Sequence, residues 1–409
     1  MISKILKYII DYYFLIFAIQ SITLIRFGIS CKLDTLFLLS SLIVGFRSFK
    51  KNRSNFESIL LILITFYLLL SWLLFNRDVS YLNVIVRTTI VPMLFFFIGK
   101  NSIEENIPML HNMKYVFVAI CIIALYLYFM PPSWYTLWKI SNMPDYVYSL
   151  SSSFYQEYFR LSGFWNYPYF ISYGCCLFFI YFLYNIKMHN SLYFIISIFI
   201  VILSALLAMQ RVALAFMMLY FVFYHFSIFQ NKNKIVEKKY LLRFDLFLLI
   251  LLSISITYIL SIISLDTIDY ITNKFIEKDN SNLISERWGM FSNIQTNFIG
   301  LFGDGIGSHG RDAKVIVSDC QYLSIYYELG LIGCCFYGIL AIGVFKRILK
   351  TGKLLFVESS VVLFYFISMI GANPLNSPDL HTPIFWYCVG RLYNGNLINI
   401  KAKNIIRTT

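Results

Sequence analysis

Four arginines are the first residues of this sequence that could do chemistry. They are Arg160, Arg211, Arg287 and Arg311. A guanidinium group binds phosphate through two parallel hydrogen bonds and stays protonated at any physiological pH. Several such groups at one surface would suit a diphosphate. Alternatively, each arginine extends to lipid phosphates or pairs with a neighbouring acidic residue.

Two carboxylates and one histidine could act as acids, bases or hydroxyl anchors. Asp319 directly precedes a long apolar stretch, and Glu328 lies inside it, about 13 Å further along a helix. A carboxylate in an apolar helix either faces a site or pairs with an arginine. The arginines within apolar segments are Arg26, Arg87 and Arg391. His309 is a candidate base, or an incidental histidine of a loop.

A glycine cluster surrounds this histidine. Residues 303–310 read Gly-Asp-Gly-Ile-Gly-Ser-His-Gly and formally contain the spacing of a dinucleotide-binding loop. That motif needs a strand before it and a helix after it, and no such unit is predicted here. The cluster is therefore interpreted as a tight turn that lets the backbone approach a ligand or a neighbouring helix.

The composition indicates that lipid surrounds most of the chain. Of its 409 residues, 59% are hydrophobic and only 13% are charged, with a mean hydropathy of +0.69. Soluble proteins carry about 25% charged residues, so too few polar groups are present to cover a water-facing surface. The net charge of +13 does not indicate nucleic acid, because the basic residues gather in short loops.

The apolar segments predict an all-α polytopic membrane protein with about twelve transmembrane helices and a single transmembrane domain over 1–409. A spanning helix needs about 20 mainly apolar residues. Such segments run near 8–29, 33–46, 57–75, 81–98, 113–130, 168–184, 191–208, 211–229, 244–265, 322–345, 354–371 and 381–398. Only Met209 and Gln210 separate two of them, which predicts a tight turn there.

The positions of the basic residues predict the orientation. With the N-terminus in the cytoplasm and alternating spans, 21 of the 34 basic residues fall in short inside segments. Cytoplasmic loops are enriched in Lys and Arg, so both termini are expected to be cytoplasmic. Two long loops, 131–167 and 266–321, are then periplasmic. In the second, apolar residues at helical spacing after Ser285 predict an amphipathic helix on the membrane surface.

The remaining composition signals are weak. Most of the eight cysteines lie in apolar runs, where cysteine behaves as a small hydrophobic residue, and no spacing indicates zinc. No metal or cofactor is expected. The first long loop is rich in Trp and Tyr, which suits either a groove for sugar rings or an aromatic belt at the membrane interface.

Four stretches, in this order, resemble the O-antigen polymerase and ligase superfamily of bacterial inner membranes. They are the segment from Arg160 through Trp165 to Pro168, the segment from Ser204 to Arg211, Glu286-Arg287-Trp288 with the Gly303 cluster, and the segment from Asp319 to Gly333. The number of spans and the large late outer loop match as well. Ligases of this superfamily typically carry a histidine where this chain has Asp319, which favours a polymerase.

The resemblance implies a glycosyltransferase that works on the periplasmic side of the inner membrane. Its substrates would be oligosaccharide repeat units linked to undecaprenyl diphosphate, and a chain-length regulator protein is the expected partner. Arg211 and Arg287 would stabilise the leaving diphosphate, with Arg160 and Arg311 assisting, and Asp319 would be the general base or the anchor of the acceptor hydroxyl. His309 and Glu328 are further substrate-binding candidates. No nucleotide or nucleic acid is expected.

Two other functions fit much of the same pattern. An O-antigen ligase would transfer the finished glycan to lipid A core. A flippase would transport the lipid-linked sugar, and about twelve spans with a basic balance suit it equally. Secondary transporters tend to have repeated halves. The asymmetric long loops and the lack of similarity between the halves of this sequence favour the polymerase.

Overall fold

The computed structural model describes most of the predicted spans. The described residues are 2–29, 31–52, 55–75, 79–141, 161–165, 168–185, 192–208, 210–230, 298–305, 320–352, 354–370, 372, 374–375 and 381–400. Within these ranges the regular structure is helical and no strand occurs. The predicted span 244–265 and the predicted surface helix after Ser285 lie outside the described residues.

The chain divides into two compact units. Unit 1 comprises residues 1–13, 33–109 and 280–409, and unit 2 comprises residues 14–32 and 110–279. The sequence pattern did not predict this division.

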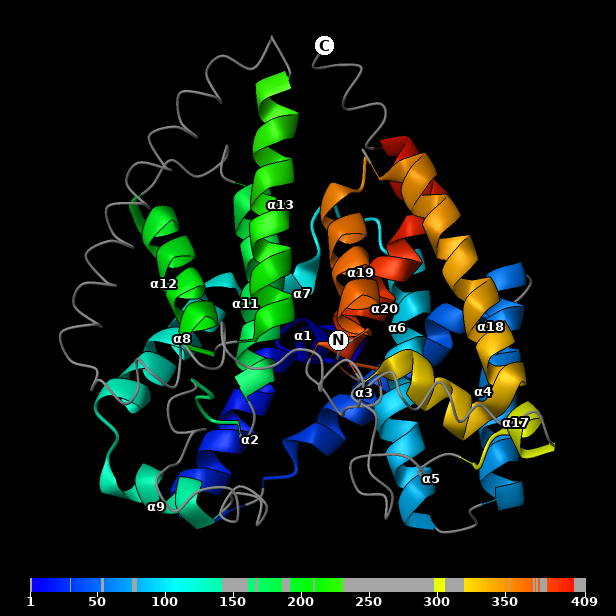
Figure 1. Cartoon of the computed structure of the whole chain (residues 1–409), viewed down its shortest axis with the longest axis horizontal. Helices are drawn as coiled ribbons and strands as arrows, with labels where there is room; N and C mark the ends of the chain where they lie inside the picture. The colour runs from blue at the N-terminus through cyan, green and yellow to red at the C-terminus, as the bar shows by residue number, and fades with distance from the viewer. Residues whose placement is uncertain are drawn as a thin grey trace, which may run out of the picture. The chain divides into compact units, whose positions relative to one another are not determined.

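In unit 1, helices α6 (Val91–Lys100) and α20 (Thr382–Leu392) pack directly against each other (Figure 1). In the described part of the chain, the labelled helices of unit 1 are α1 (Ile2–Asp11), α3 (Leu33–Asn52), α4 (Phe56–Phe75), α5 (Val79–Ile85), α6, α7 in part (Pro108–His111), α17 (Phe298–Phe302), α18 (Gln321–Thr351), α19 (Phe356–Ser368) and α20, with a π-helical turn at Val86–Ile90 and a further helical segment at 395–400. A Cβ on Gly99 would lie 2.1 Å from the Tyr387 carbonyl oxygen. A Cβ on Gly390 would lie 2.0 Å from the Phe96 carbonyl oxygen. Glycine on each side thus lets the backbones of α6 and α20 touch, as small residues do between membrane helices.

Unit 2 surrounds one helix, α11 (Pro168–Tyr184), that is buried over most of its length. Among the described residues, its helices are α2 (Tyr13–Phe27), α8 (Lys114–Phe129), α9 (Ser133–Ser141), α11, α12 (Leu192–Ala208) and α13 (Arg211–Gln230). Every side chain of α11 from 171 to 183 is buried, because α8, α12 and α13 all contact it. Phe178 of α11 stacks on Phe117 of α8 with ring centroids 4.3 Å apart. A helix that is apolar on all sides needs such surroundings.

The predicted spans within the described residues fall on observed helices, although two of them are broken and few helices meet a strict length test. Within the described residues, α4 and α18 are long and apolar enough to cross a membrane. The pair α1–α2 becomes a third if it is one broken span, and it is bent by 67° at Tyr12. Shorter apolar helices α8, α11, α12, α13 and α19 coincide with predicted spans. The number of twelve spans and their orientation stay predictions.

Candidate functional site

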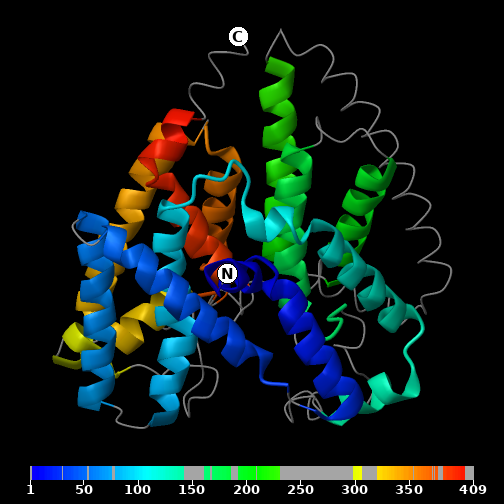
Figure 2. The same cartoon turned by 180° about the vertical axis from the view of Figure 1, so that it is seen from behind.

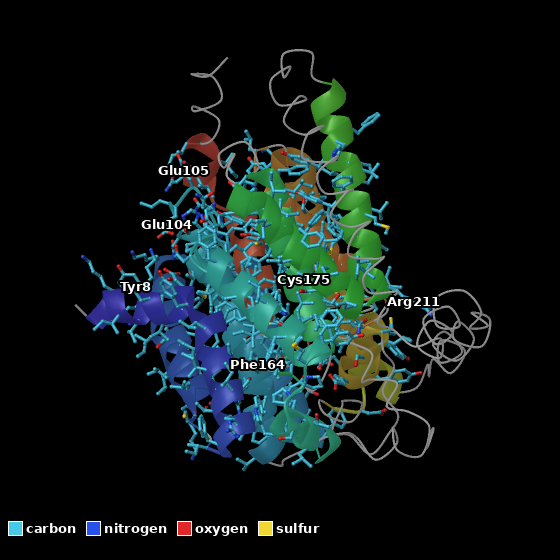
Figure 3. The ribbon with its side chains drawn as sticks, turned by 90° about the vertical axis from the view of Figure 1, so that its left-hand side faces the viewer. Tyr8, Glu104, Glu105, Phe164, Cys175 and Arg211 are labelled. Carbon is cyan, nitrogen blue, oxygen red and sulfur yellow. The ribbon has the colours of Figure 1, made fainter. Side chains whose placement is uncertain are left out.

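The seven candidate residues from the sequence are described only in part. Arg160, Arg287, His309, Arg311 and Asp319 lie outside the described residues. Arg211 is exposed at the first position of α13 in unit 2 (Figure 3). Glu328 is 7% exposed in α18 of unit 1. Each unit therefore offers one described candidate and its surroundings.

In unit 2, the segment 161–165 lies against the end of α12. The Leu161 N–H donates to the Leu207 carbonyl oxygen at 2.9 Å. Leu161 and Leu207 are buried together with Ile171. The first two stretches of the superfamily pattern thus contact each other, one residue after Arg160 and four residues before Arg211 in the chain.

A glycine and a tyrosine shape this segment. Gly163 has φ +59°, a backbone conformation that favours glycine. The Tyr135 hydroxyl donates to the Gly163 carbonyl oxygen at 2.6 Å, and its ring belongs to the same buried cluster as Phe164. Tyr135 is one of the aromatic residues of the first long loop, and it forms part of the core of unit 2.

In unit 1, the glycine cluster lies against α18. The Asp304 N–H donates to the Tyr327 backbone carbonyl oxygen at 2.7 Å. The Gly305 N–H donates to the Glu328 backbone carbonyl oxygen at 3.2 Å. We call residues 303–305 the glycine turn. The third and fourth stretches of the superfamily pattern thus also contact each other. For residues 303–305, the prediction of a close approach to a neighbouring helix is confirmed. Residues 306–310 of the predicted turn lie outside the described residues.

The glycine turn fits a break in α18. Gly330, two residues after Glu328, has φ +63° and interrupts the helix. A Cβ at Gly330 would lie 2.3 Å from the Leu301 carbonyl oxygen. A Cβ at Gly303 would lie 2.5 Å from the Glu328 backbone. Two glycines of positive φ therefore permit the turn and the break to interlock.

A tyrosine from α4 supplies a donor at the break. The Tyr67 hydroxyl lies 2.8 Å from the Leu329 carbonyl oxygen and 3.1 Å from that of Phe302. A break inside a membrane helix frees carbonyl groups that have no water to bind. Tyr67 and the glycine turn together provide hydrogen-bond donors to the carbonyls of residues 327–329.

The arginines considered as partners of Glu328 have other contacts. Arg87 forms an ion pair with Asp34. Arg26 lies over the ring of Trp134, 5.4 Å from its centroid. Arg391 binds Glu358. None of these contacts supports the hypothesis that Arg26, Arg87 or Arg391 forms an ion pair with Glu328.

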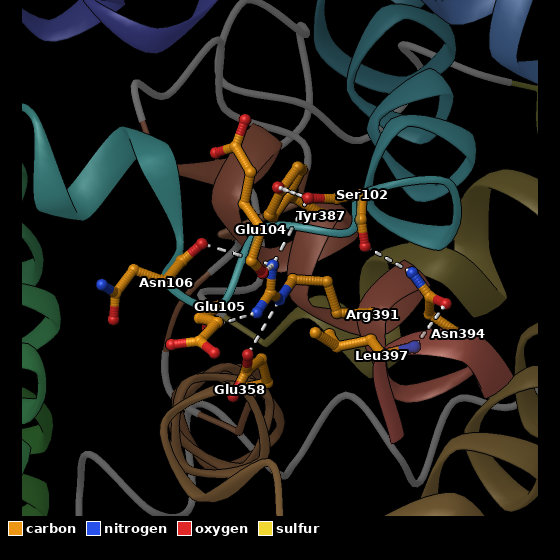
Figure 4. Close-up of polar contacts among 9 residues, drawn as sticks. All are labelled: Ser102, Glu104, Glu105, Asn106, Glu358, Tyr387, Arg391, Asn394 and Leu397. Atoms are coloured by element: carbon orange, nitrogen blue, oxygen red, sulfur yellow. Dashed lines mark hydrogen bonds and ion pairs between the residues drawn. The ribbon is translucent and has the colours of Figure 1, made fainter. Parts of the chain in front are cut away.

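The Arg391–Glu358 pair is an anchor that sequence reasoning missed (Figure 4). Arg391 is fully buried and Glu358 is 2% exposed, and Arg391 Nε donates to Glu358 Oε1 at 2.8 Å. The guanidinium also donates to three carbonyls of the segment after α6. These are Glu104 at 2.8 Å, Glu105 at 2.9 Å and Asn106 at 3.3 Å. Figure 2 shows this segment, drawn in cyan, beside α19 and α20.

A second ionic cluster lies at the end of α6. Lys100 Nζ is 3.5 Å from Glu57 Oε2, and Arg347 Nη2 is 4.0 Å from the other oxygen. Burial lowers the pKa of Lys100, and the Glu57 carboxylate offsets part of this shift. The Arg347 guanidinium also stacks over Tyr393, 4.8 Å from the ring centroid. Both clusters tie the ends of helices together.

The chemistry available in the described residues is that of hydrogen bonding and buried charge. Among them, no group of three or more His, Cys, Asp or Glu residues is arranged to hold a metal ion. The sequence matched no model of a known protein family and no curated protein.

Proposed function

We propose that this chain is an O-antigen polymerase, a multi-pass enzyme of a bacterial inner membrane with about twelve spans and both termini in the cytoplasm. One observation carries the proposal. The four stretches that resemble the superfamily contact each other in pairs, through Leu161 and Leu207 in unit 2 and through the glycine turn and α18 in unit 1. Within each unit, two stretches that contribute to one function are expected to be neighbours in this way.

In the proposed reaction, an acceptor hydroxyl oxygen attacks the anomeric carbon of a growing glycan. A new glycosidic bond forms, and the bond from that carbon to undecaprenyl diphosphate breaks. The diphosphate leaves with the electron pair, and Asp319 takes the hydroxyl proton. Arg211 and Arg287, assisted by Arg160 and Arg311, stabilise the developing negative charge without a metal. His309 and Glu328 contribute to sugar binding.

A flippase is the second candidate, because of one observation. A helix broken at membrane depth beside a buried carboxylate is a recurring feature of transporter binding sites. The break at Gly330, two residues from Glu328, fits that description. A flippase would move the lipid-linked repeat unit across the bilayer without joining two of them.

Deletion of the gene separates these functions. Loss of a polymerase leaves lipopolysaccharide carrying one repeat unit, whereas loss of a ligase or of a flippase leaves no attached O-antigen. In the complemented strain, Arg211→Ala is expected to collapse the ladder of chain lengths at unchanged protein level. Arg211→Lys keeps the positive charge but lacks the planar guanidinium group that binds phosphate through two hydrogen bonds. This variant should therefore restore the ladder only in part. The matched control is Arg47→Ala, an exposed arginine of α3.

An unchanged ladder in the deletion strain contradicts the polymerase. A normal ladder with Arg211→Ala contradicts the role of that arginine. Purified protein in lipid nanodiscs should also convert undecaprenyl-diphosphate-linked repeat units into polymer and release undecaprenyl diphosphate.

A further inference from the structure

Two cations and one carboxylate meet where three helices of unit 1 begin or end. Glu57 lies in the first turn of α4, Lys100 is the last residue of α6, and Arg347 stands four residues before the end of α18. Lys100 Nζ is 3.5 Å from Glu57 Oε2, and Arg347 Nη2 is 4.0 Å from Glu57 Oε1. We call these three residues the basic cluster. A single carboxylate faces two cations in it, so one positive charge is left unbalanced.

Two aromatic rings hold the cations in place. Phe96 and Tyr393 pack against each other with ring centroids 5.8 Å apart. The Arg347 guanidinium carbon lies 4.8 Å from the Tyr393 ring centroid. Lys100 Nζ lies 5.5 Å from the Phe96 ring centroid. A ring face attracts a cation by its charge, so these contacts position the guanidinium and leave its N–H groups for other acceptors.

The Arg347 guanidinium keeps its donors unused. It has five N–H groups, and within the described residues none of them donates a hydrogen bond, because 4.0 Å from Glu57 is the distance of an ion pair only. The side chain is 38% exposed, so a ligand can reach it from outside. Burial lowers the pKa of Lys100, and the Arg347 charge lowers it further. Glu57 therefore leaves room for a second anion.

The surroundings of the cluster are basic and apolar. The Asn101 side-chain amide donates to the Ser48 carbonyl oxygen at 2.9 Å, which places the end of α3 beside the end of α6. The last two turns of α3, α6 and α18 contain no acidic residue. Exposed basic residues at the ends of α3 and α18 are Arg47, Lys50, Lys51, Lys346 and Lys350. Apolar side chains on one face of α18 near this end are exposed by 58%, 42% and 87% at Ile342, Phe345 and Leu349.

We propose that Lys100 and Arg347 bind the phosphate group of an anionic phospholipid, whose acyl chains lie along the exposed apolar face of α18. A guanidinium forms paired hydrogen bonds with phosphate, and an ammonium group binds it as a point charge. The phosphate supplies the negative charge that the cluster lacks. An acyl chain suits the apolar side chains beside it, which a free phosphate would leave uncovered.

This lipid site is distant from the break in α18. Arg347 follows Gly330 by 17 residues, so the cluster lies roughly 25 Å further along the helix. In the predicted orientation this end of α18 is cytoplasmic, whereas the proposed reaction takes place on the periplasmic side. Lipid binding by the cluster is therefore independent of the reaction that the chain catalyses.

Titration of phospholipid into the detergent-solubilised full chain tests the site, with native mass spectrometry as the readout. The probes are phosphatidylglycerol, which is anionic, and phosphatidylethanolamine with the same acyl chains, whose ammonium group would meet the two cations. We expect phosphatidylglycerol to bind about tenfold more tightly or better, and Arg347→Gln to lose most of that difference. Lys346→Gln removes the same charge from the neighbouring exposed position and should keep the preference, which makes it the matched control.

Glu57→Gln separates lipid binding from a merely structural role of the cluster. Glutamine removes the anion that competes for both cations, so phosphatidylglycerol should bind this variant more tightly than the unmodified protein. A cluster that only holds helices together would instead give a lower unfolding temperature and no tighter binding. The unfolding temperature without lipid, measured for every variant, shows that each one is folded.

Three results would overturn the proposal. Equal binding of phosphatidylglycerol by Arg347→Gln and Lys346→Gln contradicts the role of the guanidinium. Unchanged or weaker binding by folded Glu57→Gln contradicts competition between the carboxylate and a phosphate. Millimolar inorganic phosphate that displaces the lipid from the unmodified protein assigns the cluster to a soluble phosphate, whereas lipid that stays bound supports the lipid site.

Discussion

Removal of one partner of the Arg391–Glu358 pair should destabilise unit 1 strongly. Both groups are almost completely inaccessible, at 0% and 2% side-chain exposure, so neither charge can turn to water when the other is lost. Breaking a buried pair in this way costs about 3–5 kcal/mol. Since about 1.4 kcal/mol changes a rate tenfold, Arg391→Met should accelerate unfolding by roughly 10²-fold or more.

The remaining contacts of the guanidinium predict unequal effects. After Glu358→Met, Arg391 keeps its carbonyl acceptors at Glu104, Glu105 and Asn106, so this variant should lose less than Arg391→Met. The double variant with methionine at both positions should recover at least half of the loss. An apolar pair needs no desolvation, and the segment 104–106 is exposed enough for water to replace the guanidinium.

The cysteines of the chain provide the assay. Cys388 is fully buried in α20, three residues from Arg391, whereas Cys31 and Cys335 are exposed. In a Cys31→Ser, Cys334→Ser, Cys335→Ser background, a fluorogenic thiol reagent reports unfolding as the remaining, buried cysteines become accessible. The control is Arg87→Met, because the Arg87–Asp34 pair is 39% and 14% exposed and should contribute less than about 1 kcal/mol.

Two results would refute this reasoning. If Arg391→Met unfolds as slowly as Arg87→Met, the pair is not desolvated in the membrane. If the double variant is as unstable as Arg391→Met, the anchoring of segment 104–106 outweighs the charge pairing.

Two further predictions concern the break in α18. Gly330→Ala should lower stability by about 2 kcal/mol or more, because a Cβ is strained at φ +63° and would meet the Leu301 carbonyl oxygen at 2.3 Å. Gly338→Ala, where a Cβ meets nothing within 4 Å, should be tolerated in the same thiol assay. Tyr67→Phe should cost about 1–3 kcal/mol, because the Leu329 and Phe302 carbonyls lose their hydroxyl donor. Equal unfolding rates for Tyr67→Phe and the exposed Tyr126→Phe would contradict that role.

The positions of helices were largely predictable from the sequence, because apolar length is a direct signal. The predicted span 168–184 coincides with α11 (Pro168–Tyr184), and α13 begins at Arg211, as the two-residue turn after residue 208 predicted. The break at Tyr12 was not predicted, since the apolar run continues across it. Gly330 gave no signal either, because glycine is common within membrane helices.

The contacts of the site were harder to predict. Residues 303–310 were interpreted as a turn approaching a ligand or a neighbouring helix, and the described part, 303–305, does approach a helix. Nothing in the sequence indicated that α18 would be that helix. Glu358 was not considered as a partner of Arg391, although an acid and an arginine within apolar segments are expected to pair. Three acceptors of Arg391 are backbone carbonyls, which every residue carries, so no side-chain pattern can reveal them.

The anchor on the segment after α6 also has a consequence for synthesis of the protein. Arg391 follows Glu104 by 287 residues. At translation rates of about 5–20 residues per second, those carbonyls wait roughly 15–60 s for the guanidinium that binds them. Throughout that time unit 1 is incomplete. A nascent chain that stops before α20 lacks Arg391, so the Glu358 carboxylate has lost this partner. Synthesis of α20 therefore sets the earliest time at which segment 104–106 of unit 1 can be anchored.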